Sequence, residues 1–333
     1  MKKIVQIGVG PLGQKIVKNT LQREEIHLVG AVDPDPEKAG KDLGELCGCT
    51  HMGIPVSREL TSSIKGRGAD VAVVSTFSSL ERIEPQLAEL ADAKLNIVST
   101  CEELSYPWQT QPDIAQRIDK VCRDSGVTCL GTGVNPGFLM DYLPAVMSSI
   151  CQDIEQIKVT RVQDASIRRI PFQRKIGAGL TAKQFSQRKK NGHLRHIGLT
   201  ESVHMIARAL CWRLDRVEET LDPVVAARLV SSGYKDIRQG QASGVEQYGR
   251  GYVGEEEKIT LHFRAAVGEE KSHDKIEIVG TPSFTSVIEG GINGDIATAA
   301  ITLNAISAVL RAESGLKTML EIPVPSFSGR FCV

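Results

Sequence analysis

The sequence lacks a net charge, because its 40 lysine and arginine residues balance 40 aspartate and glutamate residues over 333 positions. A chain without a basic excess has no broad attraction for nucleic acid or for an anionic membrane surface. It also lacks an apolar stretch long enough to span a membrane, and its start lacks the apolar core of a signal peptide. We therefore expect a cytoplasmic protein.

Cysteine is sparse and scattered. The eight cysteines include one C-x-C pair, Cys47 and Cys49, and no pair of C-x-x-C units from which structural zinc sites are built. His193 and His196 lie three residues apart, but no nearby Cys or acidic residue completes a metal-ligand set. We predict no metal site and, without a secretion signal, reduced thiols.

Glycine is present where it can carry chemistry. The apolar run 3–7 leads into Gly8-Val9-Gly10-Pro11-Leu12-Gly13, which is the pattern G-x-G-x-x-G, and a helix is predicted over residues 14–21. A second apolar run, residues 27–32, ends on Asp33, 25 residues after Gly8. Strand, glycine loop, helix, strand and acidic residue together form the βαβ fingerprint of dinucleotide binding. The alternative is a glycine-rich turn that binds nothing.

Each part of this fingerprint has a physical role. Gly8 permits a tight turn, Gly10 lets the backbone approach a pyrophosphate, and Gly13 lets the helix pack on the strand. The helix N-terminus, which includes Pro11 and Leu12, offers unpaired N–H groups and a partial positive charge to phosphates.

The acidic residue also bears on the choice of cofactor. Asp33 can accept hydrogen bonds from a ribose 2′-hydroxyl and would repel a 2′-phosphate, so it favours NAD(H). Lys38 and Lys41 follow a turn or two later and could partly compensate. We predict that NAD(H) is preferred, with some use of NADP(H).

The fold class follows from the order of the predicted elements. Over residues 1–133, strands at 70–76, 96–100 and 127–130 alternate with helices at 81–90 and 113–122, which predicts a doubly wound parallel Rossmann sheet. Residues 134–300 are predicted to form a second α+β domain with a mixed or antiparallel sheet. Its expected helices are 140–150 and 199–214, and its expected strands are 154–162, 247–253, 258–266, 275–279 and 283–288. Residues 166–200 are expected to be polar and glycine-rich. Residues 301–333 are assigned to the end of a helix over 296–312 and a tail that packs back on the first domain.

Ligands of open α/β sheets bind beyond the carboxyl ends of the strands. In this sequence, that rule selects the glycine loop and the segments after the third, fourth and fifth strands. The predicted cofactor-binding residues in those three segments are Ser75, Thr76, Cys101 and Asn135.

Several motifs carry a resemblance to a known family. They are the segments 98–107, 131–141 (with Gly-Thr-Gly-Val-Asn-Pro-Gly at 131–137), 196–202 and 315–325. The chain resembles 2,4-diaminopentanoate dehydrogenase and the related native amine dehydrogenases over nearly its whole length. It is more distantly similar to dihydrodipicolinate reductase, whose His-His and Lys-x-Asp-Ala-Pro-Ser-Gly signatures are absent, so that activity is not carried over.

The resemblance implies NAD(P)-dependent oxidative deamination of a primary amine, or reductive amination in reverse. It places the catalytic glutamate on Glu102 and a substrate-pocket position on Phe138, and it implies a homodimer formed through the sheet of the second domain. From the residues alone, Glu102 could instead cap a helix or pair with a lysine, and Phe138 could be a core residue. For Glu103, a solvated or capping role is favoured.

Three further residues are candidates for substrate binding. Asn135 could bind the substrate or the cofactor carboxamide, or stabilise its own turn. His196 could bind substrate or have a structural role. Arg168 begins a basic segment in which the family is neutral; a solvated face or subunit contact is the default, and an anion clamp is the sharper alternative. This basic cluster comprises Arg168, Arg169, Arg174 and Lys175.

Two other functions compete with an amine dehydrogenase. One is an imine or carbonyl reductase that exchanges no ammonia, and the other is a non-catalytic dinucleotide sensor. Glu102 and Asn135 at strand ends, with a second domain large enough to enclose a substrate, favour an enzyme over a sensor.

Overall fold

The computed structural model describes residues 1–64, 66, 68–192, 194 and 196–329, and the chain divides into two compact units. The first unit contains Met1–Phe138 and the segment that begins at Gly294, and the second contains Leu139–Asn293. The boundary expected at residue 300 would cut through helix α10 (Gly294–Val309). A helix is one hydrogen-bonded body, so α10 belongs whole to the first unit, where it packs on α1 (Pro11–Thr20).

A seven-stranded sheet of order β15-β6-β5-β4-β1-β2-β3 forms the centre of the first unit. All of its strand pairs are parallel, as the alternation of strands and helices predicts. Its strands are β1 (Lys2–Ile7), β2 (Ile26–Val32), β3 (Val56–Ser57), β4 (Val71–Val74), β5 (Asn96–Ser99), β6 (Thr128–Gly131) and β15 (Gly315–Lys317).

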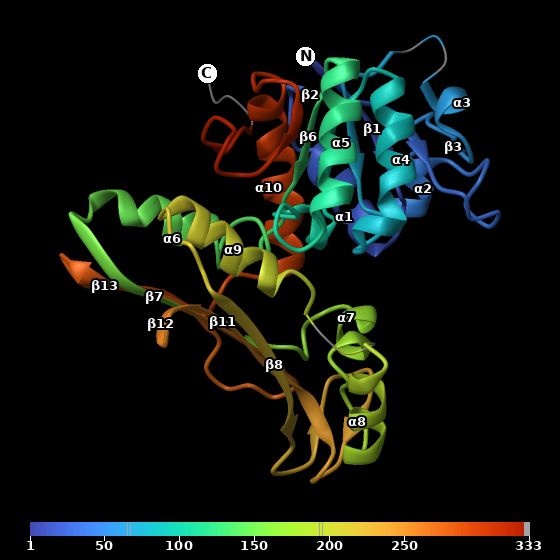
Figure 1. Cartoon of the computed structure of the whole chain (residues 1–333). Helices are drawn as coiled ribbons and strands as arrows, with labels where there is room; N and C mark the ends of the chain where they lie inside the picture. The colour runs from blue at the N-terminus through green and yellow to red at the C-terminus, as the bar shows by residue number, and fades with distance from the viewer. Residues whose placement is uncertain (65, 67, 193, 195, 330–333) are drawn as a thin grey trace. The chain divides into compact units, whose positions relative to one another are not determined.

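Helices pack in pairs on this sheet (Figure 1). α1 contacts α10, and α4 (Leu80–Asp92) contacts α5 (Pro112–Ser125). α4 buries Leu80, Ile83, Leu87 and Leu90, whose spacing of three and four residues places them on one face. The short elements α2 (Leu43–Cys47), α3 (Leu60–Ile64), β3 and β15 were not predicted, because segments of two to five residues are too short to show a period.

The second unit contains a mixed six-stranded sheet of order β14-β13-β7-β12-β11-β8, in which only β7 and β12 run parallel among these pairs. A two-stranded ribbon, β9 (Val230–Ser231) with β10 (Asp236–Ile237), accompanies it. The six strands are β7 (Asp153–Asp164), β8 (Arg216–Val225), β11 (Ala242–Val253), β12 (Glu256–Ala266), β13 (His273–Thr281) and β14 (Phe284–Glu289). The Rossmann sheet plus a second domain with a mixed sheet confirms the predicted fold class.

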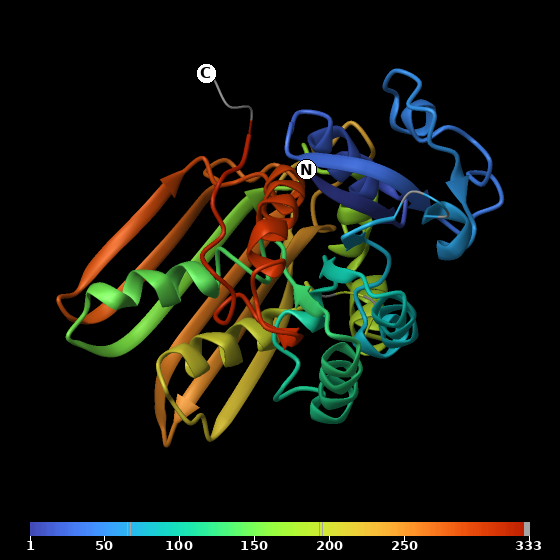
Figure 2. The same cartoon turned by 90° about the horizontal axis from the view of Figure 1, so that it is seen from above.

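One face of this second sheet is covered by helices. Figures 1 and 2 show α6 (Tyr142–Met147) and α9 (Leu199–Ala209) lying along it. Side chains alternate across a strand, so Ile157, Val159, Arg161 and Gln163 of β7 share this face, and all four are buried. The apolar core of the unit lies here, with two polar side chains at one end of the row.

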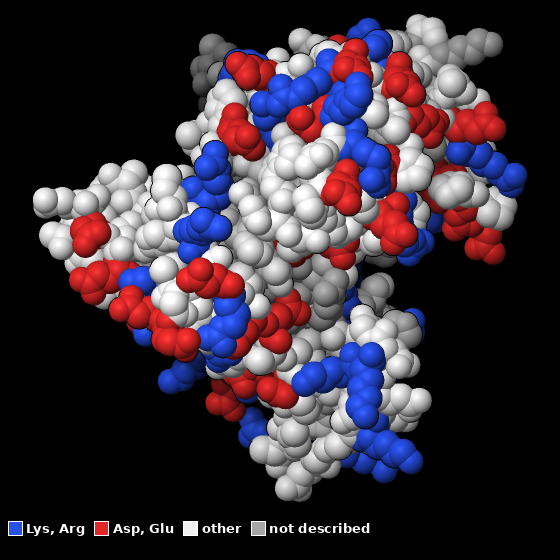
Figure 3. Space-filling model, viewed as in Figure 1, with Lys and Arg blue, Asp and Glu red and all other residues white. Residues whose placement is uncertain are grey.

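The region 166–200 differs from expectation, since it contains helices α7 (Ile170–Lys175) and α8 (Ala182–Lys190). α8 begins with a capping box between Thr181 and Gln184 and buries Phe185 alone, so its sequence shows no apolar stripe. Figure 3 shows lysine and arginine side chains gathered over α8.

Two further elements of the second unit depart from the prediction. β8 was missed because this edge strand is rich in charged residues and shows no clear apolar alternation. α9 was predicted to reach residue 214 but ends at Ala209, since Cys211 takes a left-handed conformation with a φ of 56° that a helix cannot continue through.

No helix in the described part of the chain is long and apolar enough to cross a membrane.

Candidate active site

The glycine loop between β1 and α1 has the shape that the fingerprint requires. Gly8 has a φ of 87°, and a Cβ there would lie 2.9 Å from the carbonyl oxygen of Ser75. A Cβ at Gly13 would lie 2.1 Å from the carbonyl oxygen of Gly8, whereas one at Gly10 would meet no atom within 4 Å. Gly8 and Gly13 are therefore required for packing, and Gly10 leaves open space at the N-terminus of α1, where Pro11 and Leu12 begin the helix.

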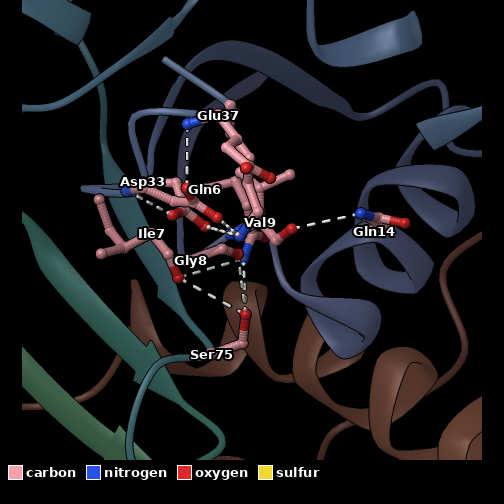
Figure 4. A network of polar contacts seen from close by, with 10 residues as sticks. Gln6, Ile7, Gly8, Val9, Gln14, Asp33, Glu37 and Ser75 are labelled. Atoms are coloured by element: carbon pink, nitrogen blue, oxygen red, sulfur yellow. Dashed lines mark hydrogen bonds and ion pairs between the residues drawn. The ribbon is translucent and has the colours of Figure 1, made fainter. Parts of the chain in front are cut away.

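Hydrogen bonds from the side chains of Gln6 and Ser75 hold this loop in place (Figure 4). The buried amide of Gln6 donates from Nε2 to the carbonyl oxygen of Gly8 at 2.9 Å and to Ser75 Oγ at 3.0 Å. Ser75 Oγ in turn donates to the carbonyl oxygen of Gly8 at 3.1 Å. The structure thus uses Ser75 to fix the loop, while Thr76 donates to Gln86 of α4 at 2.6 Å. Sequence reasoning missed Gln6, although a glutamine inside a buried apolar strand was a visible signal.

Asp33 lies at the end of β2 against the same loop. Its Oδ2 accepts hydrogen bonds from Val9 N–H at 2.8 Å and from Lys38 Nζ at 2.9 Å, and its Oδ1 accepts from Asp35 N–H at 3.0 Å. Burial opposes ionisation, but the bonds from Lys38, Val9 and Asp35 lower the pKa of Asp33 below its ordinary value. The carboxylate is therefore charged at neutral pH and paired with a lysine.

The two glutamates that follow β5 lie in different surroundings. Glu103 Oε2 accepts from the Leu80 N–H at 2.8 Å and from Gln111 Nε2 at 2.9 Å, so it caps the start of α4 as expected. Glu102 is the first residue of the 3-10 turn η1 (Glu102–Leu104) and is partly exposed. The described hydrogen bonds thus assign the capping of α4 to Glu103.

Cys101 precedes Glu102 with its side chain in the core. The residue is 1% exposed, and burial raises the pKa of its thiol well above the ordinary range. A contact between Cys101 and a cofactor would therefore have to come from its backbone.

Asn135 follows β6 in a loop that the structure holds tightly. The residue is buried, and neither its Oδ1 nor its Nδ2 has a hydrogen-bond partner within the described residues. The loop is fixed by a bond from Val134 N–H to Thr298 Oγ1 of α10 at 3.2 Å, a support that sequence reasoning missed. A buried amide without a partner costs about 1–3 kcal/mol, which points to a ligand that supplies the missing bonds. Phe138, the last residue of this unit before the chain enters the second unit, is half-buried.

In the second unit, Arg168 belongs to an ordered hydrogen-bond network. The buried pair Arg161 and Asp274 is 2.7 Å apart, and the Ile292 carbonyl accepts from both Arg161 and Gln163 at 2.7 Å. Gln163 Oε1 then accepts from Arg168 Nη1 at 2.8 Å. Burial lowers the pKa of Arg161 to about 10, which still leaves it charged at neutral pH.

His196 is fixed beside this network by its backbone and by its ring. Its N–H and carbonyl both bond to the side chain of Gln247, at 2.8 and 2.9 Å, and its ring lies 4.2 Å from that of Phe263. Burial, then the charges of Lys175, Arg161 and Arg168, lower the pKa of the imidazole well below its usual value. The ring is therefore neutral at pH 7, and within the described residues its buried Nδ1 has no hydrogen-bond partner.

The predicted basic cluster does not act as one group. The guanidinium of Arg168 lies 4.0 Å over the ring of Phe172, whereas exposed Arg174 bonds to the hydroxyl of Tyr234 at 2.8 Å. Lys175 and Arg169 are partly buried. Arg168 thus extends the Arg161 network, and Arg174 lies on the surface.

Within the described residues, no three His, Cys, Asp or Glu side chains lie close enough together to hold a metal ion. His193 lies outside the described part of the chain.

Comparison with known proteins decides which family this geometry belongs to. Residues 138–329 match the family model of the 2,4-diaminopentanoate dehydrogenase C-terminal domain, and residues 2–102 match that of the dihydrodipicolinate reductase N-terminus. The chain belongs to the 2,4-diaminopentanoate dehydrogenase family. This confirms the resemblance seen in the sequence.

Known proteins match this chain over nearly its whole length. The 2,4-diaminopentanoate dehydrogenase of Acetoanaerobium sticklandii is 29% identical over 97% of this chain and 94% of its own length. An amine dehydrogenase of Streptomyces virginiae is 22% identical, over 97% and 96%. The structure of an amine dehydrogenase from Mycobacterium smegmatis shares the fold with a TM-score of 0.87 at 21% identity, covering 99% of this chain and 98% of that one. This member of the 2,4-diaminopentanoate dehydrogenase family is thus an NAD(P)-dependent oxidoreductase of the class that acts on CH–NH2 groups.

Proposed function

We propose that this dehydrogenase catalyses the reversible oxidative deamination of a small primary amine, with Glu102 as its acid–base residue. The observation that carries the proposal is the pairing of Glu102 and Asn135 at the carboxyl ends of adjacent strands. β5 and β6 are parallel and in register from Ile97 with Cys129 to Ser99 with Gly131. A carboxylate and an unsatisfied buried amide therefore follow neighbouring strands of the sheet that carries the glycine loop.

The residues present fit a nicotinamide dinucleotide. Gly10 leaves the space that a pyrophosphate needs, the N-terminus of α1 faces it, and Asp33 stands at the end of β2 to meet a ribose. Asn135 would bond the carboxamide of the cofactor or the substrate. When bound, the cofactor takes up a hydride from carbon.

The chain itself must then handle protons and water. Only a neutral amine has the lone pair that expels hydride, so Glu102 takes a proton from the substrate ammonium. Glu102 passes this proton to solvent, so its carboxylate is ionised again and stabilises by its charge the iminium that loss of hydride leaves. Water adds to the iminium carbon with Glu102 as base, and Glu102 then gives this proton to the nitrogen, so that ammonia leaves as the carbonyl forms. The balance is ammonium plus water plus oxidised cofactor giving carbonyl, ammonium ion, reduced cofactor and one proton.

Ammonium dependence tests this proposal. We expect NADH oxidation with at least one small aldehyde, ketone or oxo acid to require added ammonium at mildly alkaline pH. Oxidation that proceeds without ammonium would instead support an imine or carbonyl reductase. NADH binding without any turnover across the panel would favour a dinucleotide sensor.

We propose further that NAD(H) is preferred and that Lys38 permits some use of NADP(H). Asp33→Ser is expected to raise the ratio of NADPH to NADH turnover, measured as kcat/KM, by about 10-fold or more. It removes a carboxylate that would repel a 2′-phosphate and releases Lys38 from its 2.9 Å bond.

Asp35→Ser is the matched control for cofactor choice. Asp35 also pairs with Lys38, at 3.5 Å, but its side chain does not accept the Val9 N–H. The ratio should change much less in this variant. Equal ratios in the wild type and in Asp33→Ser would show that another residue selects the cofactor.

A homodimer through the second sheet is also part of the proposal, in a cytoplasmic setting. The face opposite α6 and α9 carries half-buried aromatic and charged side chains in rows. Tyr248 stacks on His262 with ring centroids 4.4 Å apart, and His262 bonds Glu246 at 2.9 Å. Such ordered, planar rows suit a second copy of the same face. Sedimentation equilibrium of the full chain gives the mass that tests this.

A further inference from the structure

A cavity of about 490 Å³ lies within the first unit, at the amino ends of the first two strands of its sheet. Lys2 begins β1 and Glu25 immediately precedes β2, and both residues line the cavity. The glycine loop and Asp33 follow the opposite ends of these strands, roughly 17 Å away along β1. The cavity is therefore separate from the dinucleotide site, and its volume lies within the range of about 300–1,000 Å³ that is usual for small-molecule sites.

A polar face of α10 forms one wall of this cavity. Asn304, Ser307 and Ala308 recur at spacings of three and four residues, which places them on one side of the helix. Arg311, just beyond the end of the helix, lines the cavity as well. A second wall is the tail 324–329, which Figure 1 draws in red beside α10. A largely apolar helix thus presents amide and hydroxyl groups next to a guanidinium at this one place.

Arg23 holds the tail against α10. Its Nη1 donates to the carbonyl oxygen of Ser328 at 2.8 Å, to Ser328 Oγ at 3.1 Å and to Asn304 Oδ1 at 2.6 Å. Its Nε donates to Asn19 Oδ1 at 2.9 Å, so that all four acceptors are neutral. Arg23 is 8% exposed, and burial lowers the pKa of its guanidinium, which still remains charged at neutral pH. Within the described residues, this buried cation bonds two cavity-lining residues and pairs with no carboxylate.

The charged side chains that line the cavity have a positive excess. Lys2 and Glu25 neutralise each other in an ion pair of 2.6 Å. Arg311 is exposed and pairs with no carboxylate in the part of the chain that the structure describes. Together with the buried charge of Arg23, this excess favours an anionic ligand, and a guanidinium suits the two oxygens of a carboxylate or phosphate.

Apolar surface lies next to this charge. Val324 and Phe327 line the cavity although they are 70% and 81% exposed. Apolar side chains gain free energy when another apolar group covers them and removes them from water. A ligand that carries both an anionic head and an apolar body therefore matches the two kinds of surface at once.

We infer that this cavity is a second, non-catalytic binding site, which takes a small organic anion with a carboxylate or phosphate head and an apolar body. The guanidinium of Arg311 binds the head, and Val324 and Phe327 contact the body. Arg23 is a positioning residue, because its bonds to Ser328 keep the tail in place. The amine chemistry uses none of these side chains, so binding alone tests the site.

Titration with 3-phenylpropanoate and with phenyl phosphate is the experiment, with NADH at saturation to fill the dinucleotide site. Isothermal titration calorimetry gives the Kd, and the methyl NMR signals of Val324 report where the anion binds. We expect at least one of the two anions to shift these signals. Its Kd should rise by about 10- to 150-fold in Arg311→Gln, the range for loss of a charge-assisted hydrogen bond. The neutral 3-phenylpropanamide should bind at least about 10-fold more weakly than 3-phenylpropanoate.

Arg188→Gln is the matched control, because Arg188 is an exposed residue of α8 and its loss makes the same change of charge elsewhere. It should leave the Kd of the anion within about twofold of the wild type. Arg311→Lys keeps the charge and should restore part of the affinity, and an unchanged Kd of NADH shows that Arg311→Gln folds correctly. Val324 signals that shift with neither anion, a carboxamide that binds as tightly, or equal effects of Arg311→Gln and Arg188→Gln would overturn the inference.

Discussion

Replacing Glu102 with glutamine is expected to lower kcat for amine oxidation by about 10²- to 10⁴-fold, the usual contribution of a positioned acid–base group. Glutamine has nearly the same shape but cannot take a proton from the substrate ammonium or from the attacking water. The dissociation constant of NADH should stay within about twofold, because the glycine loop and Asp33 hold the cofactor independently of this carboxylate. Stopped-flow turnover and fluorescence titration with NADH measure the two quantities.

Glu103→Gln provides the control from the neighbouring position. Glu103 caps α4 through the Leu80 N–H and bonds Gln111, so its loss should cost stability of about 1 kcal/mol and leave kcat within a few-fold of the wild type. Glu102→Gln should therefore lose turnover and keep its unfolding temperature, whereas Glu103→Gln should lose stability and keep its turnover. Unchanged turnover in Glu102→Gln would remove Glu102 from the mechanism.

Arg161→Met is expected to lower the free energy of unfolding by about 3–5 kcal/mol, the cost of breaking one side of a buried ion pair. Arg161 is 1% exposed, bonds Asp274 at 2.7 Å and also donates to the Ile292 carbonyl. Removing it leaves an ionised carboxylate in the core with one main-chain donor, the Ile292 N–H at 2.8 Å. Urea unfolding followed by circular dichroism measures the loss.

The double variant Arg161→Met/Asp274→Asn tests the cause of that loss. Asparagine removes the buried charge while its side-chain oxygen still accepts the Ile292 N–H. We expect the double variant to regain more than half of the lost free energy of unfolding. A double variant no more stable than Arg161→Met would show that packing, rather than an unpaired charge, explains the effect.

The Arg161–Asp274 pair also predicts how the loss of stability in Arg161→Met depends on pH. Burial raises the pKa of Asp274 above its ordinary value even with Arg161 present, and removal of Arg161 raises it further. A carboxyl group whose pKa is raised in the folded state stabilises the fold when protonated, and this contribution is lost as pH rises through the folded pKa. The free energy of unfolding that Arg161→Met loses relative to the wild type should therefore be smaller at about pH 5 than at about pH 8. An equal deficit at both values would contradict the ionised state assumed for Asp274.

The local patterns of this chain were sufficient for the main strands and the glycine loop of its first unit. The glycine loop, the strands of the sheet and Asp33 show as apolar runs and as spacings within one βαβ unit, so the sequence alone predicts a parallel sheet and a dinucleotide site. The motifs at 98–107 and 131–137 likewise identify the family. Short elements and the charged strand β8 gave no such pattern and were missed.

Partners that are distant along the chain could only come from the tertiary structure. Asp274 follows Arg161 by 113 residues, and Thr298 follows Val134 by 164. Which of two adjacent glutamates caps a helix, and which of four basic residues joins a buried network, depends on such partners. Sequence determined the periodic and short-range features because these depend on neighbouring residues. The register of the sheets and the packing of helices on them decided the rest, because only they bring distant side chains within hydrogen-bonding distance.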